Sequence, residues 1–256
     1  MHPELGDVRR PTRQPGPLSP SRHLLAPLRQ WQTVLGVGVS HGTPGVSVGS
    51  LSAHKYAETD LLAASVFERA VGNEIDTVIR EARLPWHVFH DLHEFRDLPS
   101  IAGRPDIQVL KYNIDSLVVT EHTWVVIDAK NIQPGELFVS RTDKTGWWRG
   151  EKEREVKRQP WLDQTWSELT VVHAVAYRLA GATLGKIVIV VPEGVRDDGS
   201  LLESEVLRCG AVSAIVSLDE LGTALTGLLE HEAGPTPEVV ATCSRYLYSP
   251  SRVVEL

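Results

Sequence analysis

Two aspartates and one lysine interrupt an otherwise apolar stretch of this chain. It runs from Asn113 to Lys130 and reads Asn-Ile-Asp-Ser-Leu-Val-Val-Thr-Glu-His-Thr-Trp-Val-Val-Ile-Asp-Ala-Lys, with a polar break that is typical of a β-hairpin turn. If Glu121 and His122 form the loop, Asp115 falls opposite Asp128, and Lys130 shares a face with Asp128 because side chains alternate along a strand. Like charges placed opposite each other destabilise a strand pair. A divalent cation is the simplest group that would hold them together.

Such a patch suits the hydrolysis of a phosphodiester bond. Magnesium prefers carboxylate and water oxygens, and it usually takes one or two protein carboxylates. When it is bound to the scissile phosphate it can polarise that group and orient a water molecule. A lysine two residues further along the strand can position the attacking water and help to deprotonate it.

The same residues also have a simpler interpretation. Asp128 and Lys130 are neighbours on one face, so they could form a surface ion pair, worth ~0–1 kcal/mol. Asp115 could be an edge or solvent-facing residue of its strand. The elements around the hairpin must therefore decide whether these charges form a site.

Periodicity predicts an α/β fold with a mixed central β-sheet flanked by helices. A helix is expected over residues 58–83, where Val71, Ile75 and Val78 follow helical spacing, and Leu84-Pro85 ends it. The remaining expected elements are strands at 86–91, 113–119, 123–130, 135–140, 146–149, 186–191 and 211–217, and helices at 160–181 and 218–230. The charged run 149–158 is interpreted as a solvated segment.

The composition divides the chain into two parts. Residues 1–50 are expected to be a Pro- and Arg-rich tail followed by an extended segment, and residues 51–256 the α/β domain. The net charge of −7 argues against a protein coated in positive charge for non-specific nucleic-acid binding, but it permits a local basic groove.

The two cysteines, Cys209 and Cys243, lack the spacing of a zinc site, which favours a reducing, cytoplasmic location. No apolar run reaches the ~18 residues of a membrane span, and prolines interrupt any signal-peptide core near the N-terminus. The frequent arginine, alanine and valine residues are in keeping with a GC-rich bacterial source.

The hairpin and its neighbours resemble the nuclease-related domain, NERD, of the PD-(D/E)XK nuclease superfamily. The resemblance rests on Asn113-Ile-Asp-Ser-Leu-Val-Val and on Ile127-Asp-Ala-Lys-Asn131. It also includes Gly72-Asn-Glu74 in the helix ahead of the sheet, Trp147, and Gln159-Pro-Trp-Leu-Asp-Gln164 at the start of a long helix. It covers roughly residues 65–220 and implies a restriction-endonuclease-like core.

The resemblance also implies roles for individual residues. Asp115 and Asp128 would bind Mg²⁺, or alternatively Mn²⁺, and Lys130 would serve the attacking water. Glu74 would complete the acidic cluster, and Gln164 would support the site. Helical periodicity does not distinguish Glu74 from Glu68, and the resemblance alone selects Glu74.

Pro105-Asp106 spells the first letters of the superfamily motif. However, it precedes the hairpin, and the register that pairs Asp115 with Asp128 gives Asp106 no place beside them.

The implied function is metal-dependent nucleolytic cleavage, with DNA as the favoured partner. Basic residues near the third and fourth strands, namely Arg141, Lys144, Lys152 and Lys157, are candidate phosphate contacts. The alternative is a catalytically inactive module of the same fold that binds nucleic acid or a protein. Trp147 and Trp148 could stack on bases, although a strand tryptophan is more often part of the core.

Overall fold

The computed structural model describes residues 37–45, 58–92, 94–95, 114–139, 146–150, 156–158, 172, 176, 180–199, 212–248 and 253–256. The expected helix at 160–181 therefore lies almost wholly outside the described residues. The same holds for most of the segment 1–50, so the division at residue 50 stays a prediction.

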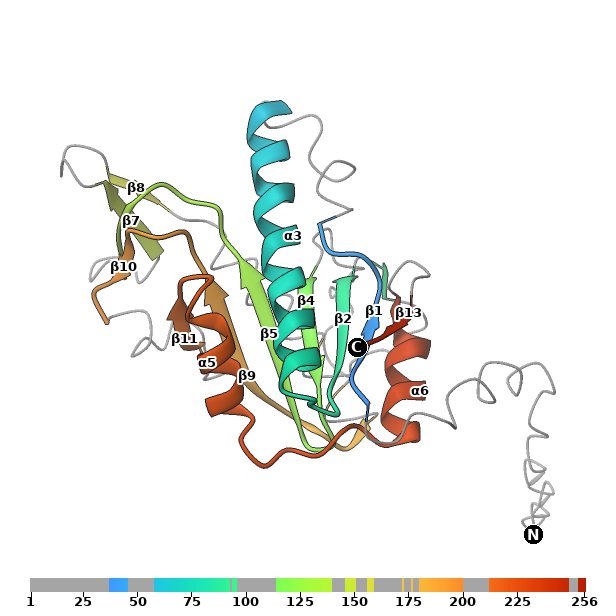
Figure 1. Cartoon of the computed structure of the whole chain (residues 1–256). Coiled ribbons are helices and arrows are strands. Elements are labelled where there is room, and N and C mark those ends of the chain that lie inside the picture. The colour runs from blue at the N-terminus through green and yellow to red at the C-terminus, as the bar shows by residue number, and fades with distance from the viewer. Residues whose placement is uncertain are drawn as a thin grey trace, which may run out of the picture. The chain divides into compact units, whose positions relative to one another are not determined.

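A seven-stranded mixed sheet forms the centre of the described domain (Figure 1). Its order is β11 (Val212–Val216), β9 (Thr183–Val190), β5 (Thr123–Ala129), β4 (Ile114–Val119), β2 (His87–Leu92), β1 (Val39–His41) and β13 (Val253–Glu255). β11, β9 and β5 are parallel, β4 is antiparallel to both of its neighbours, β1 is parallel to β2, and β13 is antiparallel to β1. The predicted mixed sheet is confirmed.

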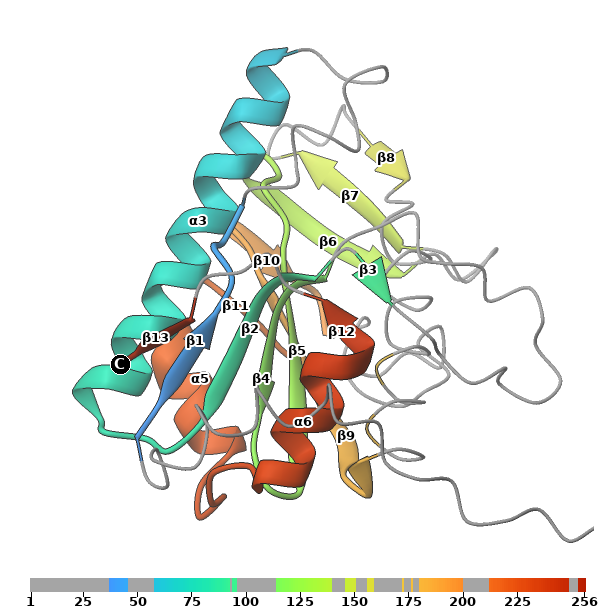
Figure 2. The same cartoon turned by 90° about the vertical axis from the view of Figure 1, so that its right-hand side faces the viewer.

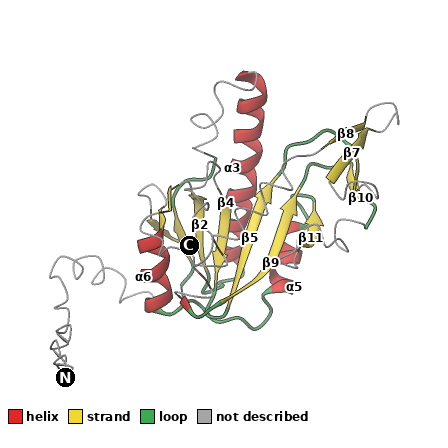
Figure 3. Ribbon diagram, turned by 180° about the vertical axis from the view of Figure 1, so that it is seen from behind, coloured by secondary structure: helices red, strands yellow, loops and turns green. Residues whose placement is uncertain are grey.

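Both faces of this sheet are buried. On one face, Val118, Val125 and Ile127 pack with residues of α3 (Glu58–Glu81) and α5 (Leu221–Leu228). On the other face, Leu117 and Val126 pack in a cluster that includes residues of α6 (Pro237–Tyr246). Figure 2 shows α6 on the side of the strands away from α3, and Figure 3 shows the strands in front of α3. Strands buried on both faces are expected to be almost continuously apolar, as β4, β5 and β9 are.

α3 ends where the sequence predicts that it should. Arg83 adopts φ 52°, the amide of Arg83 donates to the Arg80 carbonyl, and the amide of Leu84 donates to the Ile79 carbonyl. These are the two hydrogen bonds of a Schellman cap, in which the residue after the helix takes a left-handed conformation. Pro85 follows at once and prevents any further helical turn.

A second sheet of four strands follows the hairpin in the chain. Its order is β10 (Val195–Asp197), β6 (Gly135–Val139), β7 (Gly146–Gly150) and β8 (Val156–Arg158). Residues 156–158 are thus a strand rather than part of a solvated run, which corrects the expectation for that segment. A two-stranded pair, β3 (Glu94–Phe95) with β12 (Leu247–Tyr248), completes the described strands.

Candidate active site on the central hairpin

The hairpin of β4 and β5 has the register that the sequence predicts. Ser116 pairs with Ile127 and Val119 with Trp124, so the next position of this ladder sets Asp115 opposite Asp128. The turn closes at Thr120, whose amide donates to the Thr123 carbonyl.

Asp115 is bound to the end of the opposite strand. The amide of Ala129 donates to Asp115 Oδ2 at 2.7 Å, and a hydrogen bond also joins the carboxyl groups of Asp115 and Asp128. Burial raises the pKa of Asp115, and the charge of Asp128 raises it further, against the opposing effects of Lys130 and the Ala129 amide. The two carboxyl groups are therefore held together with Asp115 favouring its protonated form.

Lys130 compensates part of that charge. Its Nζ lies 2.5 Å from Asp128 Oδ1, and the side chains of Lys130 and Asp128 are only 19% and 4% exposed. The surface ion pair considered from the sequence would require much greater exposure. The Asp128–Lys130 pair is instead buried at the carboxyl end of β5.

The helix carboxylate that lies near this pair is Glu68. It precedes Val71 and Ile75 on the face of α3 that packs against the sheet. Burial raises its pKa, as do the charges of Asp115, Asp91 and Asp128, while Lys130 acts in the opposite direction. Within the described part of the chain, Glu68 Oε2 is buried and has no hydrogen-bond partner.

Glu68 is the glutamate of α3 on which the hairpin carboxylates act, whereas the family resemblance selects Glu74, and the role of Glu74 stays a prediction. Glu74 lies one helical turn before Val78, and Val78 lies on the flank of α3 that faces Gly222 at the start of α5. The contacts of α3 with its neighbours distinguish the two glutamates, which periodicity alone does not.

Asp91 is a further acidic residue of the cluster that the sequence analysis missed. His90 pairs with Ser116 and Leu92 with Ile114, so Asp91 falls opposite Asp115. Asp91 is 1% exposed and has φ 55°, a left-handed conformation that is uncommon outside glycine and often marks functional sites. Finding it would require the register between β2 and β4, and nothing in the sequence sets that register.

A buried polar network fixes α3 on the strands beside the cluster. His90 Nδ1 is 2.8 Å from Ser116 Oγ, and His90 Nε2 is 3.1 Å from Asp76 Oδ1. Ser40 donates to the other oxygen of Asp76 at 3.1 Å. Asp76 stands two helical turns after Glu68, so the network sets how far along the sheet Glu68 lies.

The other predicted site residues cannot be placed in this way. Gln164, Arg141, Lys144 and Lys152 lie outside the described residues, as does Pro105-Asp106. Lys157 lies in β8, where its backbone pairs with Trp148.

The atoms that these residues offer are of the kind that a hard cation binds. Oxygen ligands are what Mg²⁺ prefers, and Asp115, Asp128 and Glu68 supply carboxyl oxygens. Across the described segments, however, no three His, Cys, Asp or Glu side chains are arranged so that they could hold a metal ion as they stand. Metal binding is therefore a proposal, and it requires these side chains to move.

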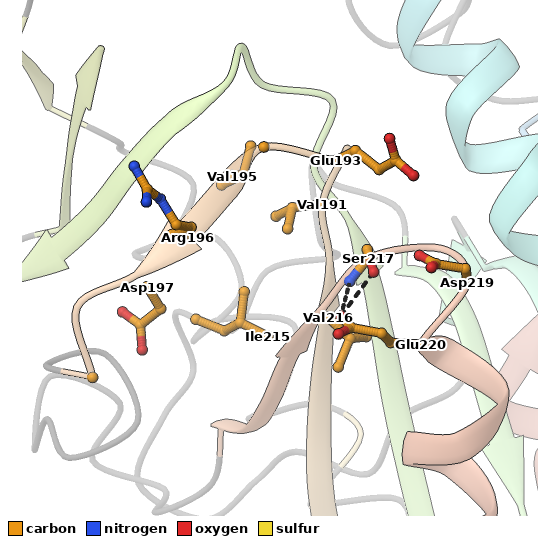
Figure 4. A pocket seen from close by; sticks show the side chains of 12 residues that line it. Val191, Glu193, Val195, Arg196, Asp197, Ile215, Val216, Ser217, Asp219 and Glu220 are labelled. Carbon is orange, nitrogen blue, oxygen red and sulfur yellow. Dashed lines mark hydrogen bonds between the residues drawn. The ribbon is translucent and has the colours of Figure 1, made fainter. Parts of the chain in front are cut away.

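A cavity of about 570 Å³ lies at the carboxyl ends of β9 and β11 (Figure 4). Four carboxylates line it, those of Glu193, Asp197, Asp219 and Glu220, against one guanidinium group, that of Arg196. Ser217 directs both its amide and its hydroxyl to Glu220 Oε2, at 3.0 and 2.7 Å. Because this lining is acidic, the cavity disfavours a phosphate backbone.

The mixed sheet, its covering helices and the buried charges at its centre define an α/β domain built around a charged site. The family model of the nuclease-related domain, NERD, matches residues 63–187, which contain most of α3 and the whole hairpin. This part of the chain is therefore similar to the nuclease-related domain, and the resemblance seen in its sequence is confirmed. Neither the curated proteins nor the solved structures include a match. None of the helices described is long and apolar enough to cross a membrane.

Proposed function

We propose that this protein is a metal-dependent nuclease that hydrolyses phosphodiester bonds, with DNA as the favoured substrate. One observation carries the proposal: Asp115, Asp128, Lys130 and Glu68 converge from two strands and a helix within a nuclease-related domain. Isolated buried carboxylates are costly, so a cluster of them in such a domain points to function more than to stability. The order helix, strand, hairpin is also in keeping with a PD-(D/E)XK core.

Asp115 and Asp128 would hold Mg²⁺ or Mn²⁺, and Glu68 would complete the carboxylate set. When bound, the metal would polarise the scissile phosphate and stabilise the charge that develops on it. Lys130 would bind and orient the attacking water from the side of Asp128. The Ala129 amide would keep Asp115 in place through its 2.7 Å hydrogen bond.

Cleavage of plasmid DNA and of single-stranded oligonucleotides tests this proposal. Wild type should cut in Mg²⁺ or Mn²⁺ and not in EDTA, whereas Asp128→Asn and Lys130→Met should each lower the rate at least about 100-fold. His122→Ala is a matched control, because His122 lies at the other end of the same hairpin with a side chain that is 74% exposed.

Two results would contradict the proposal. Cleavage that persists in EDTA would exclude the metal, and equal rates for wild type and Asp128→Asn would exclude the site. Binding of DNA without any cleavage would instead identify the inactive nucleic-acid-binding module. The ion pair between Asp128 and Lys130 favours that alternative, since it already neutralises one of the carboxylates.

A further inference from the structure

The four-stranded sheet β10-β6-β7-β8 has two unlike faces. Residues directly opposite each other on paired strands share a face, and the pairs are Leu137 with Trp148, Phe138 with Trp147 and Glu136 with Arg149. The pairs Arg149 with Val156 and Arg196 with Glu136 extend this pattern to β8 and β10. We call one of the two faces the outer face. Its described side chains are those of Glu136, Phe138, Trp147, Arg149, Val156 and Arg196.

The inner face belongs to the hydrophobic core. Leu137 is fully buried and Trp148 is 6% exposed, and both lie in the same apolar cluster as Leu117 and Val126 of the hairpin. Trp148 also donates from its indole nitrogen to the Gln133 carbonyl at 3.0 Å. Trp148 is therefore part of the core, as a tryptophan in a strand more often is.

The outer face is accessible. The side chains of Arg149 and Glu136 are 42% and 41% exposed, Val156 is 46% exposed, and Arg196 is exposed. Phe138 and Trp147 are half-buried. Val156 is one of only three large apolar residues that are exposed in the described part of the chain, so this face differs from the rest of the surface.

The outer face combines aromatic rings with guanidinium groups. The Arg149 guanidinium lies 4.8 Å from the centre of the Phe138 ring, within the range of a cation–π contact. Among the described side chains of this face two arginines stand against one glutamate. The Arg149–Glu136 pair is long at 3.4 Å and exposed, so it holds Arg149 only weakly. The face is locally cationic in a chain of net charge −7.

We propose that the outer face binds single-stranded nucleic acid. Aromatic side chains on a sheet can stack on unpaired bases, and arginines beside them can contact the phosphates. In a duplex the bases stack on one another and are not available to these rings. Figure 2 places β6 and β7, and Figure 1 places β7, beyond the carboxyl end of β5, where Asp128 and Lys130 lie, so a bound strand would run beside the candidate active site.

This inference deepens the proposed function and rests on it for the class of substrate. Binding is to be measured by fluorescence anisotropy with the full chain in EDTA, so that no cleavage occurs. The probes are labelled oligothymidylate of about 20 nucleotides, which exceeds the usual site size, the matching oligouridylate, and a duplex of equal length. Wild type should bind at least one of the single strands about 10-fold more tightly than the duplex.

Arg149→Ala and Trp147→Ala should each weaken single-strand binding by about 5- to 150-fold, the range of one lost stacking contact. Trp147→Phe keeps a stacking ring and should restore most of the affinity, which a merely structural loss would not allow. Arg245→Ala is the matched control, because Arg245 also lies over a ring, that of Tyr246 at 5.1 Å, but on α6. If Trp147→Ala fails to fold, Arg149→Ala and Arg196→Ala test the same face at exposed positions.

The outcomes separate this inference from the proposed function. Equal affinity for duplex and single strands, or an equal loss in Arg245→Ala and Arg149→Ala, would overturn the binding face while metal-dependent cleavage still stood. Conversely, single-strand binding that depends on Arg149, in a protein that cuts nothing, would overturn the nuclease and retain the binding face.

Discussion

The two candidates for the helix carboxylate of the cluster, Glu68 and Glu74, lie six residues apart along α3. Because successive helical residues turn by ~100°, Glu68 and Glu74 point in directions roughly 120° apart. The charges of Asp115, Asp91 and Asp128 raise the pKa of Glu68, and Val78, one turn after Glu74, faces Gly222 of α5. The two glutamates of one helix therefore make a natural matched pair.

Glu68→Gln is expected to lower metal-dependent cleavage at least about 10-fold, and Glu74→Gln is expected to leave it unchanged. Glu68→Gln should also raise the melting temperature in EDTA at neutral pH, because burial raises the pKa of the Glu68 carboxyl and a neutral amide removes the cost of keeping that buried group protonated. Cleavage assays and thermal unfolding of both variants check this. A lower rate in Glu74→Gln alone would restore the choice made on the family resemblance.

At the scale of elements, the turn of the β4–β5 hairpin is held by the segment that precedes α6. Glu232 accepts hydrogen bonds from the Thr120 hydroxyl at 2.8 Å and from the Thr123 hydroxyl at 2.5 Å. The amide of His122 also donates to Glu232, at 3.3 Å, and the amide of Glu121 donates to the Ala233 carbonyl. These contacts fix the turn end of the strands that carry Asp115 and Asp128.

Glu232→Ala is expected to lower the free energy of unfolding by about 1–2 kcal/mol, since hydrogen bonds to a charged group are lost but water can reach the site. Burial alone would raise the pKa of Glu232, but the bonds from Thr123 and Thr120 outweigh it and lower the pKa below the ordinary value of 4.5. A carboxylate with a lowered folded-state pKa stabilises the fold above its unfolded pKa and loses this effect as pH falls.

Urea unfolding from pH 7 downward measures this effect. The difference between wild type and Glu232→Ala should be full at neutral pH and should shrink as the pH falls below about 4.5 through the lowered folded-state pKa. Glu230→Ala is the control, because the side chain of Glu230 is 71% exposed and its ion-pair contact, with His231, is long at 3.6 Å. A pH-independent difference would show that the carboxylate charge is not responsible.

The elements that the sequence predicted are those whose pattern is local. α3, β4, β5 and β11 combine a regular apolar period with clear turn signals, and the hairpin register followed from Glu121-His122 alone. The elements that were missed are short strands such as β1, β8 and β10, of three residues each. Such strands exist because of their partners rather than their own pattern, and the same dependence on long-range pairing hid Asp91 and made Glu68 indistinguishable from Glu74.

On the scale of the whole domain, one edge of the main sheet is closed by the last residues of the sequence. β13 pairs with β1 through Val39–Glu255, Ser40–Val254 and His41–Val253, and the amide of Leu256 donates to the Gly38 carbonyl at 2.8 Å. β1 in turn pairs with β2, which carries His90 and Asp91. An unpaired β1 would present free backbone groups, which is unfavourable and promotes aggregation.

Deletion of residues 253–256 is therefore expected to cost roughly 2–3 kcal/mol in lost backbone pairing, or a fall in melting temperature of about 4–12 °C for a domain of this size. Glu255→Ala keeps the backbone pairs and should melt like wild type, which separates the pairing from the side chain. Cleavage well below the transition should be retained, because β1 and β2 lie between β13 and the hairpin. Circular dichroism would show an unchanged melting temperature if β13 contributed nothing, whereas loss of cleavage without loss of stability would mean that this edge acts on the site directly.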